Sequence, residues 1–579
     1  MKTEQTPSWK NRVVVCLPIA AVLTFMYIVF GLLEVVLNNA KDFSFTFAQA
    51  LLPLLAVWLA ATLVLSALMA CFRGLGLRIV TGVVTGVTVC SYIQNLLLNL
   101  DLGLLEGEEI DWSAYGSHGL YNLLIWAAIL IAVLVCAVLL KKYWLTAARA
   151  VCALLLVMQA VALGVSAVTT LQSVGTDETK RYALDGGEQF SVSAQGNVIV
   201  FVLDYCANTY WDETVSAYPE VGEWFNDFTY YSNCDPTYIG TFPSMTHMLT
   251  GYAFDTTVTI DQWFSDAWGS DSSEAFYSAL AQNGYSLRLY TTAPKNMGLM
   301  YAMNKVDNLV DKEASGTVST VHYDKLLTKS LAMAAYRYLP HELKKNFSLS
   351  STDFAGIVTS QALGSEVVLN KHRFYQELTG SGLKVEQDDG KLLIVQHLRG
   401  THAPYTLSEN AEYLPGATMT QTARGNFLIV KEYLDQMKAL GLYDDATIII
   451  TSDHGDKENN MQVIYFIKQP GESHDEMEEN EAPISHLDFQ GTLLQAVGAD
   501  ASALGRTTIY DWSEDDERER TVMRNAMDKN YPKVQKYGST STGTHTAMYF
   551  YTYEGNLKDL RKQVKRGPTE IRPLTESFN

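Results

Sequence analysis

Three short segments contain residues that could carry out chemistry together. "NVIVFVLD" ends at Asp204, "TFPSMTHMLTG" begins at Thr241, and "TIIITSDHG" contains Asp453 and His454. Carboxylates and imidazoles are ordinary ligands for a divalent metal ion. A Thr hydroxyl needs such an ion or a base, because an unassisted alcohol is a poor nucleophile at neutral pH. The sequence therefore indicates a metal-assisted Thr nucleophile, with all four residues as candidate metal ligands.

Each of these residues has a commoner role when it is taken alone. An Asp after a strand usually caps a helix or forms a turn, and a single His is usually a satisfied surface or core residue. The combination of the four is what favours a catalytic site. Thr237 is the alternative nucleophile if the register of the Thr segment differs.

The elements around these segments predict an α/β domain. Apolar strands alternate with helical patterns, which is typical of a mostly parallel sheet covered by helices. The candidate residues follow the carboxyl ends of strands, where open α/β sheets bind ligands. The clearest segments are "NVIVFVLD", "SEAFYSALAQNGYSLRLYT", "KLLIVQHLRGTHAPY" and "ARGNFLIVKEYLDQMKALGLYDDATIIITSDHG".

The first 170 residues have a different composition. Each of their five apolar runs is about as long as the ~20 residues that cross a bilayer as a helix. Soluble helices rarely remain apolar on every face for that length, so we expect a five-helix transmembrane domain. The runs are Val13–Leu37, Ala50–Phe72, Ile79–Leu100, Leu120–Leu140 and Ala150–Val168.

Basic residues orient this bundle. They fall on alternate connections, which the positive-inside rule assigns to the cytoplasm. We therefore expect a multi-pass cell-membrane protein with a cytoplasmic N-terminus and an extracytoplasmic catalytic domain. The residues are Lys2, Lys10, Arg12, Arg73, Arg78, Lys141, Lys142 and Arg149.

Charge and cysteine usage fit that compartment. The chain has 43 Lys and Arg against 63 Asp and Glu, and all of the acidic excess follows residue 149. This balance argues against a nucleic-acid partner, which needs clustered basic residues. Five of the seven cysteines lie in or beside apolar runs. Cys206 and Cys234 lie outside them, and an oxidising compartment predicts a disulfide between them, with free thiols as the alternative.

These observations divide the chain into four parts. We predict a transmembrane domain over 1–171, a Ser-, Thr- and Gly-rich linker over 172–195, a catalytic domain over 196–513, and a small strand-containing C-terminal subdomain with a tail over 514–579.

The Thr segment resembles a known family. Its Thr, Pro-Ser and Leu-Thr-Gly fall in register with the Cys-x-Pro-Ser-Arg and Leu-Thr-Gly pattern of the sulfatase-like branch of the alkaline phosphatase superfamily. "GLYDDATIIITSDHG" is similar to that family's last metal-binding strand, and "PISHLDFQGTLLQAVG" to its downstream pattern. The resemblance spans about 197–498 and implies a sulfatase-like α/β fold with a mixed, mostly parallel sheet.

Departures from the pattern change the expected reaction. Thr241 cannot form the formylglycine of sulfatases, because its Cβ carries a methyl group, and Met245 replaces the sulfatase Arg. Asp204 is followed by Tyr205 where many sulfatases have a second acid, which favours one tightly held ion. Zn or Mn suits the imidazole ligand better than Ca, and a second ion is left open.

With the membrane helices, the Thr nucleophile resembles lipoteichoic acid synthases and phosphoethanolamine transferases. The resemblance implies transfer of phosphoglycerol or phosphoethanolamine from a phospholipid through a phospho-Thr to an envelope glycan or lipid. In "HLRGTHAPY", His402 matches the transferases' substrate-contacting His and is a candidate catalytic residue; His397 is the weaker partner. A phosphoester or sulfate-ester hydrolase and a non-enzymatic protein with a vestigial site are the alternatives.

Four further polar residues are expected to have structural or solvated roles. His486 lies in "ISHLDF", which is usually structural in the family, and His247 follows Thr241 on a predicted helix. Lys295 occupies about the place of a sulfatase Lys but has a poor flanking match. Glu34, near the outer end of the first apolar run, is expected at the interface or near substrate.

Overall fold

The computed structural model describes most of the 579 residues. The described ranges are 8–38, 45–100, 116–173, 182–291, 294–311, 318–347, 357–361, 370–387, 390–456, 461–526 and 547–574, with a few shorter pieces between them. Two compact units form: one contains residues 1–177 and 319–359, and the other contains residues 178–318, 360–538 and 544–579. The loop at 101–112 and much of the predicted linker lie outside the described residues.

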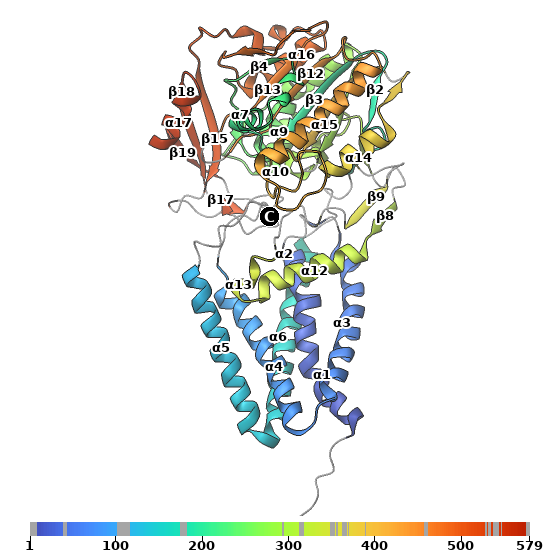
Figure 1. The fold of residues 1–579 in the computed structure, drawn as a ribbon, viewed down its shortest axis with the longest axis vertical. Helices are drawn as coiled ribbons and strands as arrows, with labels where there is room; N and C mark the ends of the chain where they lie inside the picture. The colour runs from blue at the N-terminus through green and yellow to red at the C-terminus, as the bar shows by residue number, and fades with distance from the viewer. Residues whose placement is uncertain are drawn as a thin grey trace, which may run out of the picture. The chain divides into compact units, whose positions relative to one another are not determined.

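The first unit is a bundle of long apolar helices (Figure 1). Among the described residues, five helices are long and apolar enough to cross a membrane, as the sequence predicted. They span Trp9–Leu37, Phe47–Ala70, Gly74–Leu98, Gly116–Leu139 and Lys141–Val168. By element these are α1 (Trp9–Phe25) continued by η1 (Met26–Phe30) and α2 (Gly31–Asn38), α3 (Phe47–Ala70), α4 (Gly74–Ile93) continued by η2 (Gln94–Leu98), α5 (Gly116–Leu139), and η4 (Lys141–Tyr143) with α6 (Trp144–Ser173).

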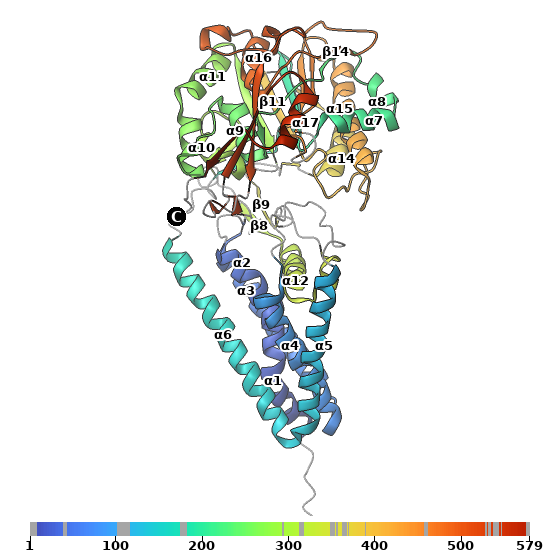
Figure 2. The ribbon, with the colours of Figure 1, turned by 90° about the vertical axis from the view of Figure 1, so that its left-hand side faces the viewer.

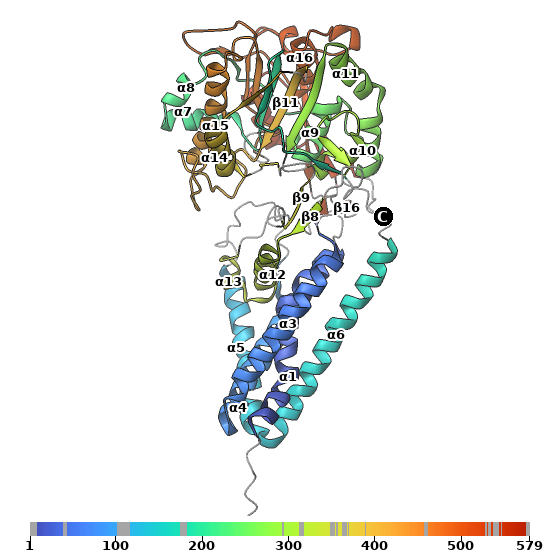
Figure 3. The same cartoon turned by 90° about the vertical axis from the view of Figure 1, so that its right-hand side faces the viewer.

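A segment from the middle of the chain completes this unit. Helix α12 (Tyr323–Tyr338) lies across the bundle helices, followed by α13 (His341–Lys344) (Figures 1 and 3). Leu326, Met333, Ala334 and Tyr338 lie on one face of α12 and pack into the apolar core of the bundle. This 3.6-residue spacing gives α12 a buried face, so the segment belongs to the membrane unit despite its place in the sequence.

Polar contacts hold α12 at the π-helical turn of the first span. Ser330 Oγ donates to the carbonyl of Ile28 at 3.3 Å, and Arg337 donates to the carbonyl of Gly31 at 2.9 Å. A π turn breaks the regular helical hydrogen-bond ladder, and these side chains bond carbonyls beside it. Arg337 also forms an ion pair with Glu34, so the structure gives this membrane carboxylate a partner on α12.

The second unit is built on a seven-stranded sheet of order β14-β4-β13-β12-β3-β11-β6. Strands β12, β3, β11 and β6 run parallel, while β13 is antiparallel to β12 and β4. The predicted fold class, a membrane bundle plus a mixed, mostly parallel α/β domain, is confirmed. The strands are β3 (Asn197–Leu203), β4 (Thr229–Tyr231), β6 (Tyr285–Thr291), β11 (Lys391–Leu398), β12 (Thr447–Thr451), β13 (Tyr465–Lys468) and β14 (Glu478–Asn480).

Helices cover both faces of this sheet, so its central strands are apolar throughout (Figures 1 and 2). Alternate residues of β3 enter separate cores. Ile199 and Phe201 pack into the core on one face of the sheet, and Val198 and Val200 pack into the core on the other face. One core is closed by α7 (Asn208–Ala217), α8 (Glu220–Glu223), α14 (Lys371–Ser381) and α15 (Met419–Ala439). The other is closed by α9 (Thr241–Thr250), α10 (Ile260–Gly269), α11 (Asp271–Gln282) and α16 (Phe489–Ala496).

A second, four-stranded sheet has the order β19-β18-β15-β5. Its strands β15 (Glu519–Ala526), β18 (Ala547–Glu554) and β19 (Glu570–Pro573) come from the C-terminal region, and α17 (Leu557–Arg566) packs on it (Figure 2). The short strand β5 (Tyr238–Ile239), directly before Thr241, joins its edge by pairing with β15. The C-terminal sheet therefore holds the segment that leads into α9.

Four pairs of short strands complete the described fold. They are β1 (Tyr182–Leu184) with β7 (Leu309–Asp311), β2 (Ser191–Ser193) with β10 (Lys384–Glu386), β8 (Val318–Val321) with β9 (Val358–Gln361), and β16 (Val534–Gln535) with β17 (Thr544–His545).

The predicted disulfide between Cys206 and Cys234 is wrong. Both thiols are free and buried. Cys206 packs in the core that contains Phe201, and Cys234 packs in the core on the opposite face of the sheet. Because the two side chains lie in different cores, they act as small apolar residues.

Candidate active site

Three parallel strands bring the candidate ligands to one edge of the sheet. Asp204 directly follows β3, His397 is the penultimate residue of β11, and Asp453 follows β12 by two residues. In the register, both His397 and Thr451 lie beside Val202. The carboxyl ends of these strands therefore meet, as the sequence predicted for Asp204 and Asp453.

The pleat places these three side chains on the same side of the sheet. Residues 198, 200 and 202 of β3, residues 393 and 395 of β11 and residue 449 of β12 all face the core closed by α9. Side chains alternate along a strand, so Asp204, His397 and Asp453 continue these rows. The sheet thus directs them toward the helix that begins with Thr241.

The side chains converge with the spacing of metal ligands. Ligand atoms of Asp204, His397 and Asp453 all lie within 4.8 Å of one another. His454 Nε2 lies 3.6 Å from Asp204 Oδ1 and 3.7 Å from Asp453 Oδ2, and His397 Nε2 lies 3.8 Å from Asp453 Oδ2. Ligands about 2.1 Å from a tetrahedral ion are about 3.4 Å apart, which is close to this spacing.

Two buried atoms of this cluster lack a hydrogen bond within the described part of the chain. They are His397 Nε2 and Asp453 Oδ2, in side chains that are almost completely buried. Buried polar atoms are normally satisfied, and a cation between these two would satisfy both. The residues therefore fit a divalent ion in three ways: they are suitable donor types, they have the spacing of ligands, and two of their buried atoms lack a hydrogen bond.

The outer nitrogens of the two imidazoles are held by other groups. His397 Nδ1 lies 2.8 Å from Thr291 Oγ1, and His454 Nδ1 lies 2.9 Å from the carbonyl oxygen of Gly455. The carbonyl requires a proton on Nδ1 of His454, which leaves Nε2 with its lone pair toward the carboxylates. Both rings thus present Nε2 to the cluster.

Thr241 is the first residue of α9 and lies beside this cluster. Gly240 precedes it with φ +139°, a conformation that favours glycine, and Ser244 Oγ donates to the carbonyl of Asp453 at 2.5 Å. The Thr241 hydroxyl lies close enough to the Asp453 carboxylate to lower its pKa. Its position at a helix N-terminus adds unpaired backbone N–H groups, which favour a bound anion.

Asp453 is ionised at this position. Complete burial opposes its charge, but His454, His397 and the nearby Thr241 hydroxyl outweigh burial and lower the pKa of Asp453 to about 2. A permanently charged carboxylate next to a hydroxyl is suited to metal binding and to orienting that hydroxyl.

The loop that carries His402 is fixed on the backbone of Asp204. Gly400 has φ +47°, and a Cβ there would lie 2.3 Å from the carbonyl oxygen of Asp204. Thr401 N donates to the same oxygen at 3.0 Å. The carbonyl of Gly400 accepts from Lys371 Nζ at 2.5 Å and from Asn426 Nδ2 at 2.7 Å.

His402 lies at the rim of the cluster. Its ring contacts the ring of Tyr205, which also contacts the ring of His454, with centroid distances of 5.5 and 5.2 Å. Sequence reasoning favoured His402 over His397, whereas the structure places His397 within the ligand cluster and His402 beside it. Strand alternation was the signal available for His397, since His397 shares its face with Asp204 and Asp453.

Other candidate residues lie away from the ligand atoms. Thr237 is buried and its Oγ1 lies 3.0 Å from Ser485 Oγ, so Thr241 is the threonine beside the cluster. His486 Nε2 lies 3.2 Å from Thr451 Oγ1. Burial lowers the pKa of His486 to about 3 and that of His247 to about 4, so both are neutral packing residues at neutral pH. The side chain of Lys295 lies outside the described residues.

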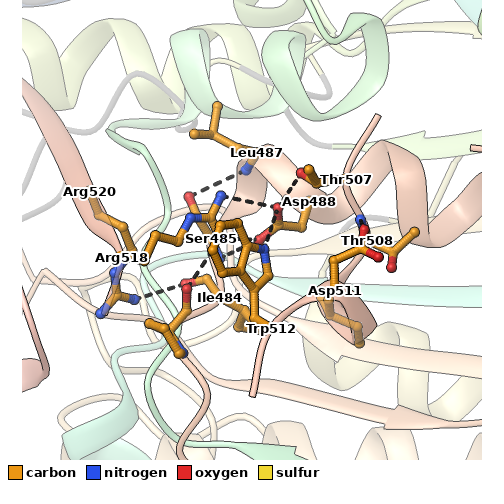
Figure 4. Close-up of polar contacts among 12 residues, drawn as sticks. Ile484, Ser485, Leu487, Asp488, Thr507, Thr508, Asp511, Trp512, Arg518 and Arg520 are labelled. Atoms are coloured by element: carbon orange, nitrogen blue, oxygen red, sulfur yellow. Dashed lines mark hydrogen bonds and ion pairs between the residues drawn. The ribbon is translucent and has the colours of Figure 1, made fainter. Parts of the chain in front are cut away.

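A charged cluster around Asp488 holds the turn at Ser485 in place (Figure 4). The carboxylate of Asp488 forms an ion pair with Arg518 and accepts from Thr507 Oγ1 at 2.6 Å and from the Trp512 indole at 3.3 Å. Asp488 also accepts from the backbone N–H of Ser485. These contacts fix the turn around Ser485 against the C-terminal region, and with it the segment that hydrogen-bonds Thr237.

Comparisons with known proteins give structural neighbours only. No protein-family model matches the chain, and no curated protein matches it. The structure is similar to the lipoteichoic acid synthase LtaP from Listeria monocytogenes, with 13% identity over 66% of this chain and 93% of that chain and a TM-score of 0.35. It is also similar to a protein in the alkaline phosphatase superfamily from Vibrio parahaemolyticus, with 11% identity over 68% and 85% and a TM-score of 0.35.

A phosphonate monoester hydrolase from Silicibacter pomeroyi is a further structural neighbour. It shows 13% identity over 66% of this chain and 88% of that chain, with a TM-score of 0.35.

Proposed function

We propose that this chain is a membrane-bound, metal-dependent transferase. It moves a phosphoryl-linked head group, phosphoglycerol or phosphoethanolamine, from a phospholipid through phospho-Thr241 to an envelope glycan or lipid. The observation that carries the proposal is the position of Thr241 at the start of α9, with its hydroxyl close to the Asp453 carboxylate and beside the cluster of Asp204, His397 and His454.

The five apolar helices support a substrate in the membrane. They fit a membrane protein, and they join the catalytic domain to the bilayer that contains the phospholipid donor. Basic residues on alternate connections favour a cytoplasmic N-terminus, which would put the catalytic domain outside the cytoplasm. A transferase that takes its donor from the bilayer and serves an envelope acceptor needs both features, an anchor in the membrane and a catalytic domain outside the cytoplasm.

A divalent ion, Zn or Mn rather than Ca, would be held by Asp204, Asp453 and His454, with His397 as a further ligand and Thr241 beside them. Such an ion lowers the pKa of a nearby hydroxyl and neutralises charge on a phosphoryl group. The Asp453 carboxylate lies close to the Thr241 hydroxyl and would orient the oxygen that attacks.

The reaction has two displacements at phosphorus. In the first, the deprotonated Thr241 oxygen bonds to phosphorus, the bond to the diacylglycerol oxygen breaks, and His402 gives that oxygen a proton. In the second, an acceptor hydroxyl oxygen bonds to phosphorus, His402 takes its proton, and the Thr241 oxygen leaves. The N–H groups at the start of α9 stabilise negative charge on the phosphoryl oxygens in both steps.

Half-reaction measurements test the proposal. The full-length protein, incubated with vesicles of phosphatidylglycerol and phosphatidylethanolamine and with Mn or Zn, should gain a head-group mass on the Thr241 peptide. Asp453→Asn should gain none. A metal-loaded protein that releases head group into water while Thr241 is never modified would instead support the hydrolase alternative.

A further inference from the structure

Three tyrosines gather beside the candidate active site. Tyr205 follows Asp204, Tyr210 lies on α7, and Tyr405 lies in the loop that carries His402. Tyr405, Tyr205 and Asp456 all lie close enough to Tyr210 to influence the charge of its hydroxyl. The Tyr205 hydroxyl lies 3.5 Å from Asp456 Oδ1. We call Tyr205, Tyr210, Tyr405 and Asp456 the tyrosine cluster.

The cluster borders the reacting atoms. The Tyr205 ring contacts both the imidazole of His402 and the imidazole of His454. All four side chains of the cluster are half-buried, as are His402 and Thr241. Aromatic surface therefore continues from the proposed proton donor to the partly open rim of the site.

The backbone holds Tyr205 in an unusual conformation. Its φ is +64°, in the left-handed region, which a residue with a side chain adopts only with backbone strain. Two hydrogen bonds fix it there: Tyr205 N donates to Asp453 Oδ1 at 3.2 Å, and Thr401 Oγ1 donates to the Tyr205 carbonyl at 2.8 Å. Strain of this kind is commonly retained at functional sites, and here it directs a bulky ring against two imidazoles.

The chemistry of the cluster suits a neutral polyol better than an anion. Its members offer aromatic faces, phenol hydroxyls and one carboxylate, and none is cationic. Arg399, in the same loop, directs its guanidinium to the carbonyl of Ala403 at 2.8 Å. Burial, and then the negative groups around it, raise the pKa of Tyr210, so its hydroxyl stays protonated and can donate. Sugar C–H faces pack on aromatic rings, while their hydroxyls bond to phenols and carboxylates.

We propose that the tyrosine cluster is the acceptor subsite and binds a polyhydroxylated acceptor, a glycan or a glycerol-type polyol, with one hydroxyl directed at phosphorus. This inference rests on the proposed function and names the acceptor class for it. The subsite adds no chemical step: the acceptor oxygen bonds to phosphorus, its proton passes to His402, and the bond from phosphorus to Thr241 breaks.

Separate measurement of the two half-reactions tests the subsite. The full-length protein is first modified on Thr241 with phosphatidylglycerol vesicles, and the loss of that modification is then followed against the concentration of maltose or glycerol. Tyr405→Ala and Tyr210→Ala should raise the KM for the acceptor by about tenfold and leave the first half-reaction unchanged. The control is Tyr413→Ala, since Tyr413 is 60% exposed and contacts the ring of His372.

Equal losses in both half-reactions would mean that the tyrosines only support the metal cluster, and an unchanged acceptor KM would mean that acceptors bind elsewhere. Either result overturns the inference.

A binding measurement separates failure of the subsite from failure of the proposed function. Saturation-transfer NMR on full-length Thr241→Ala should show contact between maltose and the protein, and adding Tyr405→Ala should remove it. If the wild-type protein never forms phospho-Thr241 but shows this Tyr405-dependent contact, the transferase proposal fails and the polyol subsite stands. Absence of contact overturns the subsite.

Discussion

Gly400→Ala tests whether the position of Asp204 controls metal binding. The φ of Gly400 is +47°, so any Cβ there costs about 1 kcal/mol of strain. The new Cβ would also lie 2.3 Å from the Asp204 carbonyl oxygen and 2.5 Å from its nitrogen. Ordinary contact needs about 3.4 Å, so the backbone of Asp204 must move by about 1 Å, a displacement that can reduce rate or affinity roughly 100-fold.

Gly416→Ala is the matched control. Gly416 has φ +75°, and a Cβ there meets nothing within 4 Å. Both variants carry the strain of a positive φ, so Gly416→Ala should lower thermal stability slightly and Gly400→Ala should lower it further, because only its Cβ clashes with the backbone of Asp204. Only Gly400→Ala should also weaken binding of Mn or Zn and slow modification of Thr241.

The assay is equilibrium metal binding to the full-length protein in detergent, with thermal unfolding measured on the same samples. The reasoning is refuted if Gly400→Ala and Gly416→Ala bind metal equally well, because Asp204 would then tolerate the displacement or would not be a ligand.

Three further predictions concern a ligand, a buried histidine and the membrane unit. His397→Phe should weaken metal binding at least ~100-fold, with His372→Phe as the unaffected control; equal affinities would remove His397 from the ligand set. Burial holds the pKa of His247 at about 4, below its usual 6.5, so unfolding takes up a proton in this window. The contribution of His247 to stability should be fully present above pH 6.5 and fall by about 1.4 kcal/mol per pH unit toward pH 4, and His247→Phe should reduce the slope of the unfolding titration by that amount. Arg337→Met leaves Glu34 without its partner and should cost about 2 kcal/mol in thermal unfolding; an unchanged midpoint would contradict the structural role of the pair.

Local sequence patterns were sufficient for the main elements. Continuous apolar runs predicted the membrane helices and the central strands. These elements are apolar on every face, so their sequences show an unbroken apolar run that differs clearly from the surrounding polar segments. The positions of Asp204 and Asp453 at strand ends followed directly from these strands.

Long-range packing was beyond the sequence. Residues 319–359 lie within the catalytic region of the chain but pack with the membrane helices, through a face of α12 that looks like that of any amphipathic helix. The choice between His397 and His402 depended on the exact end of β11, since one residue decides which face a strand side chain occupies. The two external cysteines suggested a disulfide, but the sheet between their cores keeps them apart.

The most direct test of the central claim is peptide mass spectrometry of the full-length protein after incubation with phospholipid vesicles and Mn or Zn, with Thr241→Ala alongside. A covalent phospho-Thr intermediate predicts a head-group mass on the peptide that contains Thr241, lost again when acceptor is added and never present in the variant. Unmodified Thr241 in a metal-loaded protein that still transfers the head group to an acceptor would contradict it.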